Sequence, residues 1–530
     1  MSHATSKHRS LSLQRLGILP SRPFRGALRP GVTGVQALTA AIFVLLVTAI
    51  LDYGALLDLF RGRPAAGSLE AIGGTLLVVG AVGAVAIAYL GRYGQRKTGT
   101  WQQRVVFAAC CLLCVAMAKL LAWLDGTAAP GWRSLVYLTP LAGFSVFLAV
   151  VYDQFAAIIA TLVLAVLVGL AAKMSPGGSP IAAEALPVVI VLLCGALVAI
   201  YATRSIRKRL KLFHVGVLVA LVHTVLLAGF ALIRGELNFQ GPPPVVLLWG
   251  AVNGIGVGIL LTLALPLIEI LFDVATDIRL LELTDQNQPL LRHQVARAPS
   301  TDNHARRVAL LAEAAAEAIG ANGLLALVGS YYHDIGKMAK PEYFIENQTG
   351  SGESPHDRLR PSMSALIIAA HAKDGVELAE DAGLPRAIID IIAQHHGTST
   401  MEFFLNRYLE EAGEKPQLDA SFFRYPGPRP ATKEAAIVML ADAVEAASRT
   451  LVAPLPSRID TLIKKITTAK LLDGQFEECR LTLSELTLIE HSFFRILCSM
   501  YHARIDYPTA PTDRIAARAR GLRGAASAAL

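Results

Sequence analysis

Two adjacent polar residues, His333 and Asp334, interrupt a segment that is otherwise mostly apolar or small, LLALVGSYYHDIGKMAK at residues 324–340. Burying an imidazole and a carboxylate costs free energy unless each group is paired, hydrogen-bonded or bound to a metal. More histidine and aspartate residues follow along the chain, each beside an apolar pattern of helical spacing. The pair is therefore the centre of a candidate site that the surrounding elements are expected to hold.

The chemistry that these residue types favour is metal binding. Imidazole and carboxylate groups suit Mn, Fe, Co or Zn, and the lack of a cysteine cluster argues against a structural zinc site. Five histidines and two aspartates exceed what one ion needs, and Asp334 could bridge two ions. We therefore expect two divalent transition-metal ions, Mn or Fe by preference, about 3.5–4 Å apart, as is typical of phosphoester hydrolysis. The predicted metal ligands are His304, His333, Asp334, His371, His395, His396 and Asp442.

Each candidate also has an ordinary structural explanation. A lone His304 or His371 on a helix is more often a hydrogen-bonded histidine than a metal ligand. His395–His396 could cap the C-terminus of a helix. Asp442, in VMLADAVEAASR, could be a buried hydrogen-bond acceptor. The joint occurrence of these residues around one His–Asp pair favours the metal site.

Helices must position these residues. From residue 301 onward the apolar residues recur at helical spacing, and no alternation typical of strands stands out. We expect an all-α domain over residues 301–508 and a disordered tail at 509–530. The predicted helices are 303–320, 323–339, 362–381, 385–396, 402–412, 431–450, 457–470 and 483–504.

The composition indicates that a membrane domain precedes this domain. Of the 530 residues, 53% are hydrophobic and 17% are charged, and nearly all long apolar runs lie before Phe272. A span needs about 20 mostly apolar residues. We therefore expect a polytopic helical domain over residues 34–272 and a helical connector at 273–300. The predicted spans, about eight, are 34–52, 68–91, 105–124, 134–152, 154–173, 184–203, 213–233 and 245–271.

The charge pattern predicts the orientation of these spans. Basic residues gather in the N-terminal tail, residues 1–33, and in the loops 92–104 and 204–212. Cytoplasmic loops carry an excess of Lys and Arg, so both termini and the C-terminal domain are expected in the cytoplasm and the spans in the inner (plasma) membrane. Because many cations flank spans, the net charge of +8 does not indicate binding to a nucleic acid polymer.

The order and spacing of the predicted ligands resemble those of the HD-domain phosphohydrolases. Closer similarity is to the membrane-anchored seven-transmembrane HD family, whose characterised members are cyclic di-AMP phosphodiesterases. The resemblance covers residues 250–505 strongly, and the membrane half by architecture. The similar stretches include DVATDIRLLEL (273–283), YYHDIGKM (331–338), FIENQ (344–348), QHHGTS (394–399), FRYPGP (423–428) and KEAAIVMLADAVEAASR (433–449).

Three features bear on this resemblance. The family usually carries a large extracellular domain after its first span, and this chain has only about 53–67 there. A paired-histidine motif usually opens the first ligand helix, whereas this chain has Asn303-His304-Ala305. Enzymes of the HD-GYP type, which act on cyclic di-GMP, carry Gly-Tyr-Pro after the second histidine pair. His396 is followed instead by Gly-Thr-Ser-Thr-Met, which favours cyclic di-AMP.

The resemblance implies hydrolysis of cyclic di-AMP to linear pApA, with Asp334 and Lys337 as the catalytic residues. Lys337, one turn after the pair, could contact a phosphate or could be a solvated lysine at a helix end. The connection 341–361 is long for a compact domain and is expected to cover the substrate. Its weaker candidate contacts are Glu346, Asn347, His356 and Asp357.

Other functions stay open. The domain could hydrolyse another nucleotide, such as cyclic di-GMP or guanosine tetraphosphate. It could also be a non-catalytic nucleotide-binding membrane receptor, although a pure binding module need not retain ligands for two metals. A homodimer is compatible with the general prevalence of symmetric dimers.

Overall fold

The structure is a computed structural model that describes residues 34–62, 68–93, 101–127, 134–173, 182–204, 206–236, 245–348, 353–412, 419–451 and 454–501. Helices make up the regular structure of these residues, and the extended pairing within them is the isolated bridge between Thr400 and Arg424. The predicted all-α class is therefore confirmed. The predicted tails at 1–33 and 509–530 lie outside the described residues.

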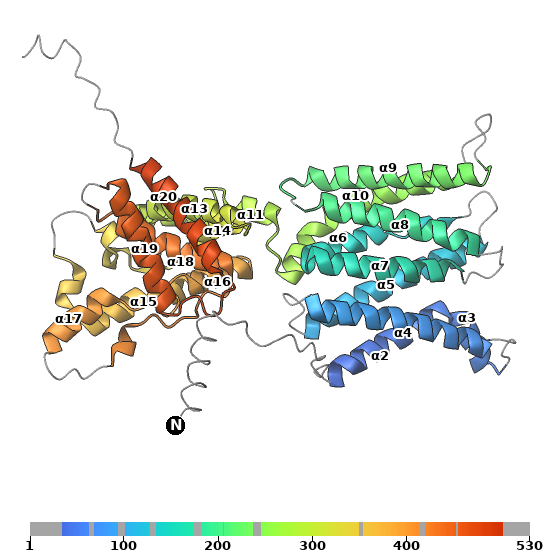
Figure 1. Ribbon diagram of the computed structural model, residues 1–530, viewed down its shortest axis with the longest axis horizontal. Helices are drawn as coiled ribbons and strands as arrows, with labels where there is room; N and C mark the ends of the chain where they lie inside the picture. The colour runs from blue at the N-terminus through green and yellow to red at the C-terminus, as the bar shows by residue number, and fades with distance from the viewer. Residues whose placement is uncertain are drawn as a thin grey trace, which may run out of the picture. The chain divides into compact units, whose positions relative to one another are not determined.

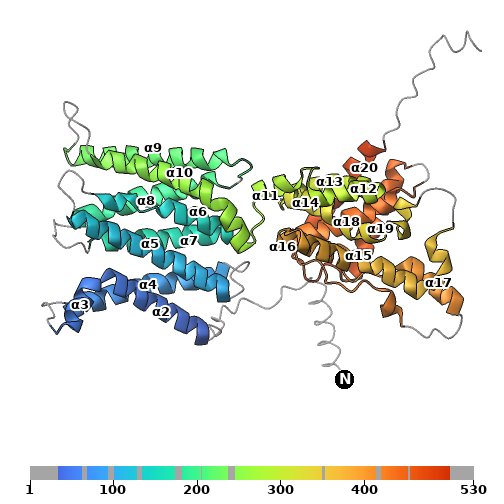
Figure 2. The same ribbon diagram turned by 180° about the vertical axis from the view of Figure 1, so that it is seen from behind.

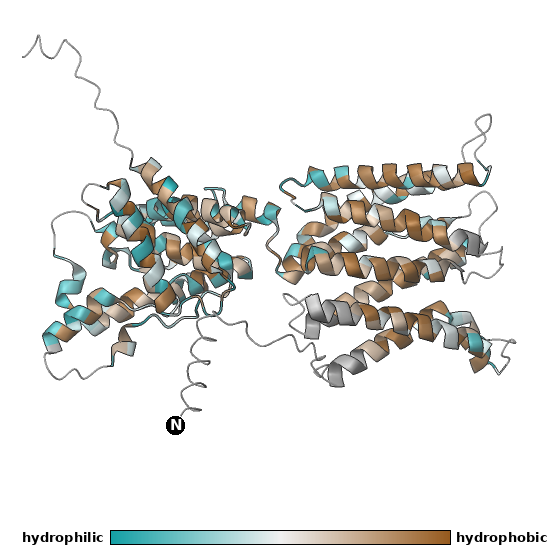
Figure 3. Ribbon diagram, in the orientation of Figure 1, coloured by the Kyte–Doolittle hydropathy of each residue, from teal (hydrophilic) through white to brown (hydrophobic). Residues whose placement is uncertain are grey.

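Backbone contacts divide the chain into two compact units. The first comprises residues 1–202 and 216–258, and the second comprises residues 203–215 and 259–530. The division falls within the two last long apolar helices, α9 (Leu210–Ile233) and α10 (Val245–Phe272), whereas the sequence predicts a boundary at residue 272. The long helices of the first unit run side by side, and they are apolar along most of their length (Figures 1, 2 and 3).

Six described helices are long and apolar enough to cross a membrane, or seven if the bent pair α2 and α3 is one span. The first predicted span, 34–52, corresponds to α2 alone, and α3 follows it after a bend of 86°. The fourth predicted span is a short 3-10 turn, η2, and an 11-residue helix, α6. The elements are α2 (Gly34–Leu51), α3 (Tyr53–Phe60), α4 (Ser68–Tyr93), α5 (Trp101–Thr127), η2 (Leu135–Leu138), α6 (Leu141–Val151), α7 (Gln154–Lys173), α8 (Ala182–Ala202), α9 and α10.

The interruption before α6 has its own polar partner. Backbone groups that leave a helix inside an apolar bundle need hydrogen bonds from the protein. Asn253 of α10 supplies them, because its buried side-chain amide donates to the carbonyls of Tyr137 at 2.8 Å and Thr139 at 2.9 Å. A hydropathy pattern alone does not reveal such a partner, which is why the sequence predicts a continuous span.

The helices of the second unit agree with the predicted ones to within a few residues at most ends, with one exception at residue 333. Short 3-10 turns occupy most of the described part of the long connection 341–361. After α10 come α11 (Asp277–Leu283), α12 (Pro289–Arg297), α13 (Pro299–Ala318), α14 (Gly323–Tyr332), η3 (Ile335–Ala339), η4 (Pro341–Tyr343), η5 (Ile345–Asn347), η6 (Pro355–Arg358), α15 (Pro361–Asp381), α16 (Arg386–Gln394), α17 (Glu402–Ala412), η7 (Ala420–Phe423), α18 (Lys433–Ser448), α19 (Pro456–Leu472) and α20 (Leu483–Met500).

Helix α18 lies in the main core of the second unit. Its residues from Ala435 to Asp442 are all buried, as expected for a helix that is apolar around most of its circumference. Thr432 caps its N-terminus by accepting a hydrogen bond from the backbone N–H of Ala435, and such caps stabilise a helix by about 1 kcal/mol. The helix is therefore a fixed support for the polar residues it carries.

The predicted helix 323–339 is wrong in one respect, because it breaks at the His–Asp pair. Helix α14 ends at Tyr332 and the 3-10 turn η3 begins at Ile335. The turn packs closely on α15: a Cβ atom added at Gly336 would lie 1.9 Å from the backbone oxygen of His371. The close approach of two backbones, which only glycine allows, thus fixes the pair beside α15.

Replacement of Gly336 by alanine is expected to force η3 away from α15. Because the added Cβ would also lie 2.5 Å from the backbone nitrogen of Gly375, side-chain movement alone cannot relieve the clash. We expect a loss of stability of about 2–4 kcal/mol together with lost metal binding. Thermal unfolding of the full chain with and without Mn(II) would measure both. The control is Gly256→Ala, where a Cβ meets nothing within 4 Å, and equal stability of the two variants would contradict the prediction.

Candidate metal centre

Five segments of the second unit bring the seven predicted ligands together. Helix α13 carries His304, the α14–η3 junction carries the His–Asp pair, and α15 carries His371. The residues directly after α16 are His395 and His396, and α18 carries Asp442. All are buried except His396, which is half-buried.

Asp334 lies between two groups of histidines. Its Oδ1 atom is 3.4 Å from Nε2 of His371 and 3.6 Å from Nε2 of His395. Its Oδ2 atom is 3.2 Å from Nε2 of His333 and 3.7 Å from Nε2 of His304. Each oxygen therefore faces its own pair of imidazoles, which is the arrangement that a bridging carboxylate requires.

Asp442 and His396 extend these two groups. Oδ1 of Asp442 lies 3.0 Å from Nε2 of His304, and its Oδ2 lies 3.6 Å from Nδ1 of His396. Candidate ligand atoms of Asp334, His371, His395 and His396 all lie within 4.8 Å of one another, as do those of His304, His333 and Asp334. The seven residues thus form two ligand groups that share Asp334.

Backbone carbonyls orient three of the rings. Nδ1 of His333, His371 and His395 each faces the carbonyl three residues earlier, of Ser330 at 2.7 Å, Ile368 at 2.5 Å and Ile392 at 2.7 Å. An Nδ1–H that donates to a carbonyl leaves Nε2 as the lone-pair nitrogen. All three Nε2 atoms therefore face the centre, and each can bind a metal when it carries no proton.

A carboxylate that the sequence analysis missed orients the fourth ring. Oε2 of Glu445, a buried residue of α18, lies 2.5 Å from Nδ1 of His304. Glu445 follows Asp442 by three residues, so both lie on one face of the helix. That spacing was the available signal, but the partner histidine is 141 positions away and only the fold brings it near.

The donor set fits divalent metal ions. Nε2 of His333 and both oxygens of Asp334 are buried without a hydrogen-bond partner, although Lys337 forms an ion pair with Asp334. Nε2 of His371 lies 3.2 Å from Nε2 of His395, and two lone-pair nitrogens repel each other at that distance. Positive ions among these atoms would remove both penalties.

Electrostatics prepare the carboxylate and one imidazole for this role. Burial alone would raise the pKa of Asp334, but His333 and Lys337 outweigh it and hold the pKa well below its usual value. Burial lowers the pKa of His371 to about 4. At neutral pH the carboxylate is therefore ionised and the His371 ring is neutral, which are the forms that bind metal.

Of the two roles that the sequence left open for Lys337, a solvated lysine at a helix end is wrong. Its side chain is 12% exposed, and Nζ lies 2.7 Å from Oδ2 of Asp334 and 2.9 Å from Oε1 of Glu346. Burial alone would lower the pKa of Lys337. The two carboxylates outweigh burial and raise the pKa above its usual value. The side chain is a charged ammonium at the edge of the metal centre.

The weaker candidates of the long connection differ in position. Glu346 reaches the site through Lys337, and Asn347 donates to Oγ1 of Thr301 at 2.8 Å. His356 and Asp357 instead serve the connection itself: His356 meets the carbonyl of Tyr343 at 2.8 Å, and Asp357 completes the capping box of η6. Of these four residues, only Glu346 and Asn347 lie toward the metal centre.

A cavity of about 310 Å³ is lined by two of the predicted ligands, His396 and Asp442. Tyr425 also lines it and stacks on the ring of His396, with ring centroids 4.1 Å apart. The metal centre is therefore accessible from a partly aromatic hollow of the second unit.

Replacement of Glu445 by glutamine is expected to weaken metal binding. The amide keeps the shape but cannot supply the negative charge that favours the His304 tautomer, and loss of such an outer partner typically costs 10–100-fold in affinity or activity. Titration with Mn(II) at pH 7.5 would measure the effect. The exposed Glu478→Gln is the matched control, and equal Mn(II) affinity in both variants would show that Glu445 does not support the site.

Metal binding is also expected to strengthen with rising pH. Burial opposes protonation of His333 and His304, but their carboxylate neighbours raise the pKa of both rings, that of His333 to about 10. A bound ion must displace these protons, so each proton released strengthens apparent affinity about tenfold per pH unit. Mn(II) titrations at pH 6, 7 and 8 would test this, and a constant affinity would contradict it.

Known proteins resemble this chain in both of its parts. Two family models match: "HD domain" over residues 301–447, and "7TM receptor with intracellular HD hydrolase" over residues 69–276. The chain is 34% identical over 439 residues to the cyclic-di-AMP phosphodiesterase PgpH of Bacillus subtilis (strain 168), covering 83% of this chain and 60% of that protein. It is 34% identical over 435 residues to PgpH of Listeria monocytogenes serotype 1/2a (strain 10403S), covering 82% and 58%.

This chain thus spans about three fifths of the length of these relatives. A crystal structure of the L. monocytogenes PgpH HD domain in complex with cyclic-di-AMP is 44% identical, with a TM-score of 0.39, and covers 41% of this chain and 100% of that one.

Proposed function

We propose that the chain belongs to the family of membrane proteins that join a seven-transmembrane domain to an intracellular HD hydrolase domain, because models of both domains match it, and that it is a metal-dependent phosphodiesterase that hydrolyses cyclic di-AMP to linear pApA. The observation that carries the proposal is the position of Asp334 between two groups of imidazoles. The named activity of two relatives supports the substrate.

We propose that two divalent ions, Mn or Fe by preference, bind this centre. His304 and His333 would hold one ion, His371, His395 and His396 the other, and Asp334 would bridge them, with Asp442 completing the set. Ions held by these residues would supply a water of lowered pKa and positive charge to offset the negative charge on the phosphoryl oxygens.

The chain's own groups prepare the site for a phosphodiester. Glu445 and the backbone carbonyls fix the directions of the imidazoles. Lys337 keeps its proton and can donate it in a hydrogen bond to a phosphoryl oxygen, which strengthens as negative charge develops there. Such donors need no reorganisation during the reaction when partners already hold them in place, as Asp334 and Glu346 hold Lys337.

The proposed setting is the inner (plasma) membrane. Several apolar helices of the first unit would span it, with both termini and the HD domain in the cytoplasm, as the basic loops predict. A cytoplasmic site would have access to a nucleotide second messenger. The partners are the substrate and the lipid bilayer, without a role for a nucleic acid polymer, and a homodimer is compatible with this setting.

The decisive experiment is hydrolysis by the full chain in detergent with Mn(II) or Fe(II). We expect turnover of cyclic di-AMP to pApA at least about tenfold faster than turnover of cyclic di-GMP or guanosine tetraphosphate, and loss of turnover with a chelator. Asp334→Ala should abolish turnover and reduce metal content, because it removes the shared carboxylate. Faster turnover of another nucleotide would contradict the substrate, and a metal-loaded chain that only binds cyclic di-AMP would indicate a receptor.

A further inference from the structure

The cavity beside the metal centre contains a cation that the proposed mechanism does not use. Lys470, in the last turn of α19, lines the cavity together with the predicted ligands His396 and Asp442. It is the only cation among the described residues that line it. The cavity's volume of about 310 Å³ lies within the usual range for small-molecule sites, roughly 300–1,000 Å³.

The charge of Lys470 is not neutralised by a direct ion pair. Its Nζ donates to Oγ of Ser399 at 2.6 Å, and no carboxylate of the described residues forms an ion pair with it. Burial lowers the pKa of Lys470, and Asp442, Asp473 and Glu402 oppose this effect from a longer distance. Lys337 differs, since it is held directly between two carboxylates.

A half-buried ammonium with a single hydroxyl partner is an available anion-binding group. Ammonium groups have three donors, and burial with too few partners costs free energy. The Ser399 hydroxyl uses one donor, which leaves two for a ligand. An anion in the cavity would satisfy them with charge-assisted hydrogen bonds.

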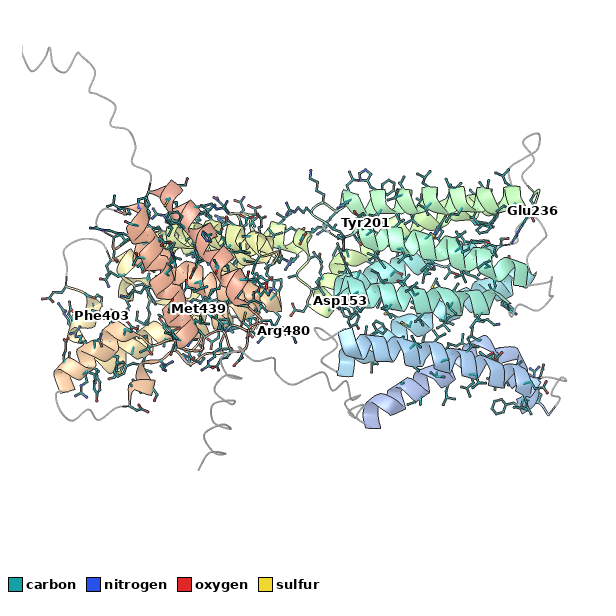
Figure 4. The ribbon with its side chains drawn as sticks, viewed as in Figure 1. Asp153, Tyr201, Glu236, Phe403, Met439 and Arg480 are labelled. Atoms are coloured by element: carbon teal, nitrogen blue, oxygen red, sulfur yellow. The ribbon has the colours of Figure 1, made fainter. Side chains whose placement is uncertain are left out.

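The remaining walls suit a nucleobase. Tyr425 and Phe404 supply aromatic surface, and Ile368 and Met401 supply apolar surface. Figure 4 labels two further lining residues, Phe403 and Met439. Aromatic side chains stack on any base, so the cavity offers surfaces for a base and a cation for a phosphate next to the predicted metal ligands.

We propose that Lys470 binds the second phosphate of the cyclic dinucleotide, the one that is not cleaved, while the first lies at the metal centre. The proposal rests on the proposed function, because a cyclic dinucleotide carries two phosphates in one small ring. If metal ions at the predicted ligands hold one of them, the other must lie close by, and Lys470 is the cation in the adjoining cavity. Lys470 is a substrate-binding residue that determines specificity for substrates with two phosphates.

The simpler explanation is that Lys470 only supports the backbone near Ser399, between α16 and α17. A structural support and a phosphate contact predict different kinetics. Loss of a support displaces His396 and lowers kcat. Loss of a phosphate contact raises KM for substrates that carry the second phosphate, and arginine, which keeps the charge, partly replaces it.

The test compares Lys470→Met, Lys470→Arg and the control Lys465→Met, an exposed lysine of the same helix, in the full chain with Mn(II). For Lys470→Met we expect the KM for cyclic di-AMP to rise about 10- to 100-fold, the loss typical of a hydrogen bond between charged groups, with kcat changed less than about threefold. Lys470→Arg should recover most of the affinity, and Lys465→Met should match the unmodified chain.

A second probe separates the phosphate contact from base stacking. Adenylyl-(3′→5′)-adenosine has the two adenosines but only one phosphate, so it should inhibit the unmodified chain and Lys470→Met equally. The proposal is overturned if KM is unchanged in Lys470→Met, if kcat falls instead of KM rising, or if inhibition by this dinucleoside weakens by the same factor as KM rises. If the unmodified chain does not hydrolyse cyclic di-AMP, the proposed function has failed first.

Discussion

The buried carboxylate of Asp334 constrains the second unit more than any other single group. It is 1% exposed, and imidazoles from α13, the α14–η3 junction, α15 and the residue after α16 face its two oxygens. A carboxylate in such a place is tolerated only when opposite charge surrounds it. Metal binding and the packing of these helices therefore depend on the same contacts, and the free energy of one is part of the free energy of the other.

Two apolar clusters hold the helices that converge on this carboxylate. One surrounds α18, whose polar residues Asp442 and Glu445 point to the centre three positions apart. The other includes Leu280 and Leu283 of the connector helix α11, which pack with Tyr332 next to the His–Asp pair. The hydroxyl of Tyr332 also donates to the carbonyl of Leu283 at 2.9 Å. The predicted helical connector thus includes α11 as a packed part of the second unit.

The sequence predicted features that depend on residue type and local period. The helices follow from apolar spacing, and the seven predicted ligands follow from polar residues that an apolar helix does not otherwise need. It could not predict features that depend on distant partners. The helix break at His333 needs Gly336 against α15, the orientation of His304 needs Glu445, and the interruption before α6 needs Asn253. In each case the contact joins residues too far apart for a local pattern to show.

The balance of charge explains why one chain carries both so many carboxylates and a site for an anion. Asp334, Asp442, Glu346 and Glu445 meet at the centre, whereas Lys337 is the cation that contacts two carboxylates there. His333, whose pKa is raised to about 10, carries positive charge that also offsets part of this negative charge. Divalent ions bound by these side chains would make the local field more positive toward an anion. Lys470 makes no direct ion pair with a carboxylate of the described residues, so its charge stays available. It can attract the phosphate of a dianionic ligand that lies away from the metal centre.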